Sequence, residues 1–160
     1  KGLEGERESH ALLVTEGEEI VPIGRISAFG SYIIMLPCDG GMEHNCLYHS
    51  AIREIGGLRE LEELDIPVER IPFPPSVSEC GIEGETPALP ITEIAAGSTH
   101  GICLDSHGIA WTWSAQGNTY MEPVLGLGRV VMIAAGADVS SVVDETGLIT
   151  CWGETEYLEP

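Results

Sequence analysis

Four side chains that could bind zinc lie close together in the stretch CDGGMEHNCLYH. They are Cys38, His44, Cys46 and His49, and they fall within twelve residues. Thiolates and imidazoles are the ligands that zinc prefers, but His44 and Cys46 are only two positions apart, a spacing that does not fit known zinc sites. We therefore interpret this stretch as a surface loop with two histidines and one or two buried cysteines. We expect neither a metal ion nor another cofactor.

The same stretch contains a candidate nucleophile. The sequence NCLY, which includes Cys46, follows Asp39 and is similar to the nucleophile motif of the ovarian-tumour-type deubiquitinases. In that family Asp-Gly-Asn-Cys is contiguous, whereas here residues 41–44 intervene. If Cys46 begins a helix, the helix dipole lowers the pKa of its thiol. The resemblance implies an alternative function, a cysteine hydrolase that uses Cys46 and Asp39 with His100 or His107 as the base.

The chain is strongly acidic. Among its 160 residues, 26 are Asp or Glu and 7 are Lys or Arg, so the formal net charge is −19. A surface of this sign repels the phosphates of nucleic acids, and we expect none to bind. It favours a protein partner with a basic surface, although acidic residues also serve solubility alone.

The cysteines and the apolar segments indicate a compartment. The five cysteines are an odd number without a CxxC pair, and Cys103 and Cys151 lie in apolar runs, as thiols do in a reducing compartment. No secretory signal is evident, and apolar runs such as 33–37 are too short to span a bilayer. We expect a cytoplasmic or nuclear protein that does not bind membranes. Because the chain starts at Lys1 and not at Met, we also expect a fragment.

The fold must position any such site, and a repeat in the second half of the chain predicts that fold. The stretch IAAGSTHGICLDSHGIAWTW, residues 94–113, recurs 39 residues later as IAAGADVSSVVDETGLITCW, residues 133–152. Each copy begins with Ala-Ala-Gly, has a second glycine eleven residues on and ends in tryptophan. A period of this length is typical of propellers and solenoids. The residues that we expect to be structural in these two copies are Gly97, Gly108, Trp113, Gly136, Gly147 and Trp152.

Two weaker copies precede these. Residues 28–41, AFGSYIIMLPCDGG, contain Gly30 and Gly41 at the same spacing of eleven, and we assign these glycines a structural role as well. Residues 10–24, HALLVTEGEEIVPIG, lack Ala-Ala-Gly, and their turn glycine stands one position early. The sequence therefore contains about four recognisable units.

Each clear unit predicts a β-hairpin. An apolar segment is followed by Asp-x-x-Gly and by a second apolar segment that ends at tryptophan. Glycine at the last turn position supplies a positive φ, so we predict positive φ at Gly108 and Gly147. Trp113 and Trp152 should occupy equivalent, mostly buried positions. Trp111 should face the same side as Trp113, and if either is exposed we expect it to be Trp111.

The pattern I-A-A-G-x-x-H-x-x-x-L-D-x-x-G-x-x-x-x-W resembles the repeat of the regulator of chromosome condensation family. The resemblance is clear over residues 91–153 and weak over residues 10–41. It implies an all-β fold of β-propeller-type repeats, usually seven blades of four strands, of which this chain would supply a partial ring. It also implies that His100 is a buried, hydrogen-bonded structural residue. The chain departs from the family after Trp113, where the usual Gly-x-Asn-x-x-Gly-Gln-Leu-Gly is reduced to SAQGN, and at Val139, which replaces the histidine.

The middle of the chain does not follow the repeat. Residues 45–67 have apolar side chains at three- and four-residue steps, which predicts a helix. Six of the ten prolines lie in residues 67–90, which predicts an extended loop. We therefore divide the chain into weak propeller repeats at 1–41, an irregular or helical insertion at 42–90, and two clear repeats at 91–160.

The function that these features favour is protein–protein interaction. The sequence contains no lysine-bearing phosphate loop and no serine nucleophile elbow, so we do not expect an enzyme. The family resemblance implies nucleotide exchange on a small GTPase, substrate recruitment in a ubiquitin ligase, or inhibitory capping of an enzyme. The sequence does not choose between these roles or identify the binding residues.

Overall fold

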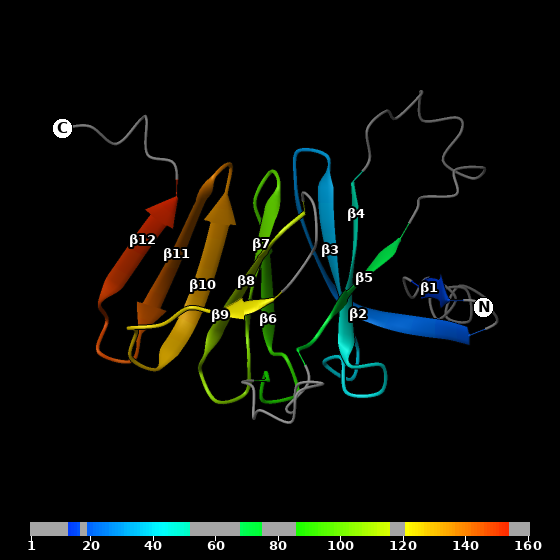
Figure 1. Cartoon of the computed structure of the whole chain (residues 1–160), viewed down its shortest axis with the longest axis horizontal. Helices are drawn as coiled ribbons and strands as arrows, with labels where there is room; N and C mark the ends of the chain where they lie inside the picture. The colour runs from blue at the N-terminus through cyan, green and yellow to red at the C-terminus, as the bar shows by residue number, and fades with distance from the viewer. Residues whose placement is uncertain (1–12, 17–18, 52–67, 75–85, 116–120, 154–160) are drawn as a thin grey trace, which may run out of the picture.

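Three antiparallel β-sheets stand side by side in a row (Figure 1). The computed structural model describes residues 13–16, 19–51, 68–74, 86–115 and 121–153, and every regular element in these ranges is a β-strand. Within the same ranges no helix has the length and apolar character that a membrane span requires. The all-β, propeller-type fold predicted from the sequence is confirmed.

The first sheet has five strands in sequence order. They are β1 (Leu13–Glu16), β2 (Glu19–Phe29), β3 (Tyr32–Pro37), β4 (Cys46–Ala51) and β5 (Glu69–Pro72). The long strand β2 pairs with β1 through its first part and with β3 through its second, with a register shift between Ile23 and Arg25. One strand thus joins the two weak repeat copies, residues 10–24 and 28–41. Because these copies share a sheet, the described residues form three units rather than four.

The helix predicted over residues 45–67 is wrong at its beginning, where β4 pairs with β3 and β5 instead. Leu47 faces the second sheet, whereas Cys46 and Tyr48 face the opposite side, and all three are buried. A strand that is buried on both faces has a nearly continuous apolar sequence, which periodicity alone does not separate from a helix. Residues 52–67 lie outside the described part of the chain.

The two clear repeats form the other two sheets. The second sheet consists of β6 (Glu93–Ala96), β7 (His100–Leu104), β8 (Ala110–Ser114) and β9 (Glu122–Pro123), and the third of β10 (Val130–Gly136), β11 (Val139–Asp144) and β12 (Ile149–Gly153). Trp113 pairs with Gly101, and Trp152 pairs with Ser140, 39 residues further on in both cases. The predicted equivalence of the two tryptophan positions is confirmed.

The turns of the two repeats are built alike. Gly108 has a φ of +83° and Gly147 a φ of +88°, which confirms the prediction. Asp105 Oδ1 and Asp144 Oδ1 each accept hydrogen bonds of 2.9–3.0 Å from the backbone N–H groups two and four residues on. At Asp144 the Thr146 hydroxyl adds a bond of 2.6 Å, and these bonds hold the pKa of that carboxyl below its usual value. The aspartates therefore fasten the turns that the glycines permit.

The main core lies between the first and second sheets. Trp111 and Trp113 both point into it, with 1% and 3% of their surface exposed, so they share one side of β8 as predicted. Neither is a contact residue at the surface. Trp111 is tolerated inside because its Nε1 donates to Asp105 Oδ2 at 3.0 Å. The remaining buried members are Tyr32, Ile34, Leu36, Leu47, Ile71, Phe73, Ile91, Ala96, Cys103 and Met121.

A smaller core lies between the second and third sheets. Its buried members are Ile102, Leu104, Ala110, Val130 and Val142. Trp152 packs against this core but is only half-buried, so the prediction that it is mostly buried is wrong. The reason is its position at an open cleft between the two sheets, which the next subsection describes.

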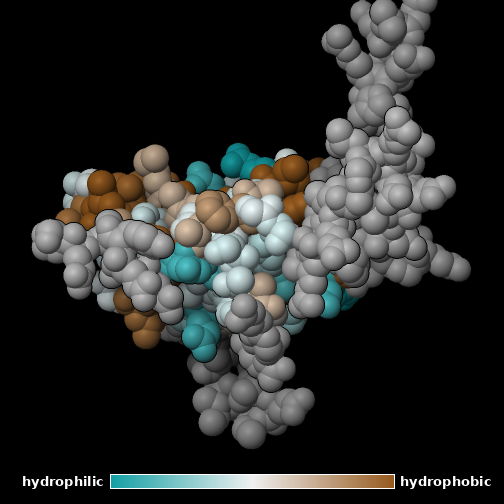
Figure 2. Space-filling view, turned by 90° about the horizontal axis from the view of Figure 1, so that it is seen from above, coloured by the Kyte–Doolittle hydropathy of each residue, from teal (hydrophilic) through white to brown (hydrophobic). Residues whose placement is uncertain are grey.

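One face of the third sheet points away from the second sheet. In the repeat it corresponds to the face that the second sheet buries against the third. The second sheet packs its side chains at Ala95, Ile102, Leu104 and Ala110 against the third. The corresponding residues of the third sheet, 39 positions later, are Ala134, Ser141, Val143 and Ile149. They face away from the second sheet, and so does Met132 beside them. Met132 is 58% and Ile149 65% exposed. Figure 2 shows apolar side chains gathered at this end of the molecule.

The turn glycines allow a test of the hairpins. We expect Gly147→Ala to lower the free energy of unfolding by about 1 kcal/mol, because alanine resists a positive φ. An added Cβ there has no atom within 4 Å, so the effect isolates the backbone. Gly108→Ala should cost more, since its Cβ would lie 2.5 Å from Arg129 Cγ. Urea denaturation measures both differences.

Gly136→Ala is the matched control for this test. Its backbone does not have a positive φ, and an added Cβ would make an ordinary contact of 3.6 Å with Phe29. We expect almost no change in stability. Equal losses at Gly136 and Gly147 would contradict the role of φ.

Candidate functional site

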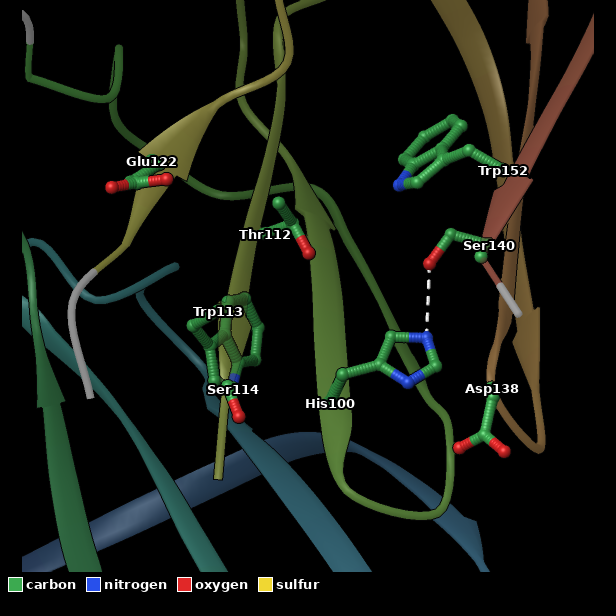
Figure 3. A pocket seen from close by; sticks show the side chains of 9 residues that line it. His100, Thr112, Trp113, Ser114, Glu122, Asp138, Ser140 and Trp152 are labelled. Carbon is green, nitrogen blue, oxygen red and sulfur yellow. Dashed lines mark hydrogen bonds between the residues drawn. The ribbon is translucent and has the colours of Figure 1, made fainter. Parts of the chain in front are cut away.

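A cleft of about 450 Å³ opens between the second and third sheets (Figure 3). Strands β7, β8 and β9 form one wall, and β11, β12 and the β10–β11 turn form the other. Its volume lies within the range of ligand pockets, roughly 300–1,000 Å³. The residues that line it are His100, Thr112, Trp113, Ser114, Glu122, Asp138, Ser140, Trp152 and Gly153.

His100 bridges the two walls. Its Nε2 lies 2.9 Å from Ser140 Oγ, so one residue of each sheet contributes to the bond (Figure 3). His100 is half-buried, which agrees with a hydrogen-bonded structural histidine but not with complete burial. The bond fixes the imidazole at one side of the cleft.

Gly97 allows the two sheets to approach each other next to this bridge. The Ser98 N–H donates to the Ala137 carbonyl oxygen at 2.9 Å. A Cβ on Gly97 would lie 2.6 Å from that same oxygen and would also collide with the His100 ring. A glycine at this position is therefore what permits the close approach of the two backbones, and this is the structural role of Gly97.

Trp113 is held in place by a chain of hydrogen bonds that reaches the first sheet. Trp113 Nε1 donates to the Tyr32 hydroxyl oxygen at 2.9 Å. The Tyr32 hydroxyl also hydrogen-bonds to Nδ1 of His49, at 2.6 Å. Nε2 of His49 faces a carboxylate oxygen of Glu69 at 3.7 Å. The chain joins β8 to β3, β4 and β5.

Burial keeps the members of this chain uncharged. It raises the pKa of Tyr32 to about 12, against the hydrogen bond from Trp113, which lowers it. Burial also lowers the pKa of His49, although the charge of Glu69 opposes that shift. Tyr32 and His49 are therefore both neutral near pH 7.

The residues of the alternative hydrolase have different neighbours. Cys46 begins a strand and not a helix, and its side chain is 1% exposed among apolar residues of the first sheet. Asp39 uses both carboxylate oxygens within its own turn, where they accept from backbone N–H groups at 2.8 and 3.0 Å. His100 bonds to Ser140 between the other two sheets. The helix dipole that would activate Cys46 is therefore absent at this residue.

The zinc-type residues are also separated. Cys46 and His49 stand three positions apart on β4, so they face opposite sides of the sheet, and Cys38 is exposed directly after β3. His44 lies 3.9 Å from Glu43. Across the described ranges, no three His, Cys, Asp or Glu side chains are close enough together to hold a metal ion.

The repeat in the sequence indicates three of the residues that line the cleft, His100, Trp113 and Trp152. It does not indicate Glu122, Asp138 or Ser140. Ser140 corresponds to Gly101 in the other copy, so the repeat shows that the two copies differ at this position. It does not show that Ser140 bonds to His100.

Comparisons with known proteins concern the fold. No protein-family model and no curated protein matches the sequence. Human WBSCR16 is similar in structure, with a TM-score of 0.54 and 13% identity over 96% of this chain and 39% of that one. The C-terminal domain of gp131 from bacteriophage phiKZ has a TM-score of 0.50 and 17% identity over 84% and 37%. Prp20p from Saccharomyces cerevisiae has a TM-score of 0.48 and 16% identity over 86% and 35%.

This chain therefore spans 39% of the length of WBSCR16, 37% of the C-terminal domain of gp131 and 35% of Prp20p. At identities this low, structural likeness is informative about the fold alone. The likeness to WBSCR16 and to the gp131 domain supports the propeller-type arrangement of the three sheets.

The buried hydrogen-bond chain predicts a pH dependence of stability. The pKa of folded His49 lies below its usual value of 6.5, so the unfolded chain binds a proton that the folded protein does not. The free energy of unfolding should therefore decrease as the pH falls from about 7 to about 5.5. Urea denaturation across this range measures the slope.

The variant His49→Asn separates this effect from other titrations. Its amide oxygen can accept the Tyr32 proton but does not titrate, so the slope should become shallower. His107→Asn is the control, because His107 is exposed. If both variants have the slope of the unchanged protein, His49 is not the cause.

Proposed function

We propose that this chain is a protein-interaction module whose cleft between the second and third sheets receives a segment of a partner protein. The observation that carries the proposal is the cleft lining. The half-buried indole ring of Trp152 lies at an opening with room for more than one side chain, and the lining of that opening also has hydroxyl and carboxylate groups. Protein-binding sites combine aromatic and polar groups in this way.

The partner should present a basic surface. The chain has a net charge of −19, and the described residues of the cleft lining include two carboxylates, those of Glu122 and Asp138, and no Lys or Arg. Opposite charges speed the encounter of two proteins and disfavour partners of the same sign. This supports a protein partner rather than a nucleic acid. The cysteine usage favours the cytoplasm or the nucleus as the location.

Two specific roles fit this proposal through the family resemblance. One is regulation of a small GTPase, and the other is substrate recruitment in a ubiquitin ligase. An exchange assay with small GTPases loaded with a fluorescent nucleotide distinguishes them, because only the first role accelerates nucleotide release.

Peptide selection tests the cleft itself. We expect peptides selected from a random phage library against the chain to bind at least about tenfold more weakly to Trp152→Ala, since aromatic anchors dominate such interfaces. Calorimetry measures the affinities, and circular dichroism shows whether the variant is folded. Ile20→Ala is the control, because Ile20 is 62% exposed on the first sheet.

A second variant shows whether weaker binding to Trp152→Ala results from a change in the cleft or from loss of structure. Ser114 is exposed at the cleft, and Ser114→Trp should fill the opening without removing a core side chain. It should weaken the same peptides. Peptides that bind both variants as well as the unchanged chain would exclude the cleft as the binding site.

A thiol-reactive ubiquitin probe tests the alternative function, that of a cysteine hydrolase that uses Cys46. We expect no labelling that depends on Cys46, because its side chain is 1% exposed and begins a strand. Cys38 and Cys151 are exposed, so the comparison with Cys46→Ser is needed to exclude their reaction. Labelling that disappears in Cys46→Ser would establish a cysteine hydrolase instead.

A further inference from the structure

The outer edge of the third sheet differs from the same edge of the other two sheets. In the first sheet β5 pairs with β4, where Glu69 stands opposite His49. In the second sheet β9 pairs with β8 in the same way, where Glu122 stands opposite Thr112. The counterpart of Thr112 in the third sheet is Cys151, on β12. Among the described residues no strand pairs with the outer edge of β12, which lies at one end of the molecule (Figure 1).

The backbone of β12 presents hydrogen-bonding groups at this edge. The Asp144 N–H donates to the Leu148 carbonyl oxygen at 3.0 Å, so Leu148 is bonded toward β11. Because successive residues of a strand direct their backbone groups to opposite sides, the N–H and C=O groups of Ile149 and Cys151 point away from β11. Both residues are exposed. Groups of this kind are where an extended segment adds to a sheet.

Strand β9 shows which bonds such a segment makes. The Val124 N–H donates to the Ala110 carbonyl oxygen at 2.8 Å, and the counterpart of Ala110 is Ile149. Pro123, which has no N–H, stands one position earlier, where an antiparallel pair needs no bond. An equivalent strand on β12 would therefore bond to Ile149 and Cys151.

The register also shows which side chain would enter the cleft. Continued by one position, the pairing of β8 with β9 places Met121 opposite Trp113. Met121 is 4% exposed and belongs with Trp113 to the core between the first and second sheets. Trp152, the counterpart of Trp113, is half-buried at the open cleft instead. A strand on β12 would thus place one side chain opposite Trp152, on the side of the sheet that faces the cleft.

The cleft has room for this side chain because the second sheet has small residues there. Between the first and second sheets, Tyr32 and His49 form the hydrogen-bond chain that begins at Trp113. Their counterparts, by position in the paired strands, are His100 and Thr112. Thr112 is smaller than His49, and His100 bonds across to the third sheet. The space that two rings fill in one gap is therefore open in the other.

We infer that the partner segment binds as an extended strand, antiparallel to β12, with main-chain bonds to Ile149 and Cys151 and one apolar side chain in the cleft beside Trp152. The inference rests on the proposed function and names the form of the segment that the cleft receives. Main-chain bonds supply affinity in this mode, and the pocket supplies specificity. A basic partner is favoured over a second copy, because two chains of charge −19 repel each other and Glu122 of the facing sheet attracts a basic residue.

A peptide copied from β9 tests the inference. Its sequence is Met-Lys-Pro-Val-Leu-Gly, which is residues 121–126 with lysine in place of Glu122, and both of its ends are blocked. NMR titration of the isotope-labelled full chain follows the binding. We expect the backbone N–H signals of Ile149 and Cys151 to shift and to exchange with solvent more slowly. The Nε1–H signal of Trp152 should shift as well.

Methylation of single backbone nitrogens in the peptide separates strand pairing from other contacts. A methyl group on the valine nitrogen removes the donor that in β9 bonds to Ala110, so the peptide should bind about tenfold more weakly. The matched control carries the methyl group on the leucine nitrogen, which is directed away from the edge, and should bind almost as well as the parent peptide. Replacement of the methionine by glycine should also weaken binding, because it leaves the cleft empty.

A variant of the chain tests the same edge. Ile149→Pro removes an outward N–H while the bonds of β12 to β11 remain, and edge strands tolerate proline. It should weaken the peptide several-fold. Ile149→Thr is its matched control, because it changes the side chain but keeps the N–H.

The outcomes separate this inference from the proposed function. Equal weakening by the two methylated peptides would show that main-chain pairing is not involved and would overturn the inference. Slow exchange of the Ile149 and Cys151 N–H groups in the chain alone would overturn it too, because a second copy or another part of this chain would then cover the edge. If the phage-selected peptides bind beside Trp152 and leave these N–H signals unchanged, only the inference fails. If no peptide binds there, both the inference and the proposed function fail.

Discussion

Each sheet of this protein has to bury its side chains against a neighbouring sheet, and the rest of the structure depends on that constraint. A hairpin alone is marginal in water, and the second sheet solves the problem on both sides. Its indole rings, Trp111 and Trp113, fill the space toward the first sheet, and Ile102 and Leu104 fill the space toward the third. The turn carboxylates and the positive φ at Gly108 and Gly147 matter because they keep the strands in a register that allows this stacking.

The same register makes the two gaps between the sheets comparable, and their contents then follow from a few side chains. Where Tyr32 and His49 stand, the gap closes around a hydrogen-bond chain that begins at the Trp113 indole N–H. Where His100 and Thr112 stand, the gap stays open. The fold thus determines where a site can exist, and side-chain size at two positions determines whether it does.

The repeat was enough to predict the sheets and their turns, since glycine, aspartate and tryptophan have local reasons to stand where they do. It was not enough for β4, because residues 46–50 are buried on both faces and lose the alternation that marks a strand. Nor could it pair Tyr32 with His49 or His100 with Ser140. The first contact depends on which strands pair within the first sheet and the second on which sheets are neighbours. The spacing of residues within one copy contains no information about either.

The composition shows that the chain is acidic, but only the structure shows where particular carboxylates lie. A net charge of −19 says which partners are disfavoured, but most of its acids are spread over a solvated surface, where screening limits their effect. Glu122 and Asp138 differ because both line the cleft between the second and third sheets, one at each end of the opening (Figure 3). A basic group of a partner that enters the cleft meets a carboxylate on either wall, whereas a group of like charge is disfavoured there. Sheet stacking thus converts a general property of the composition into a local preference for basic groups.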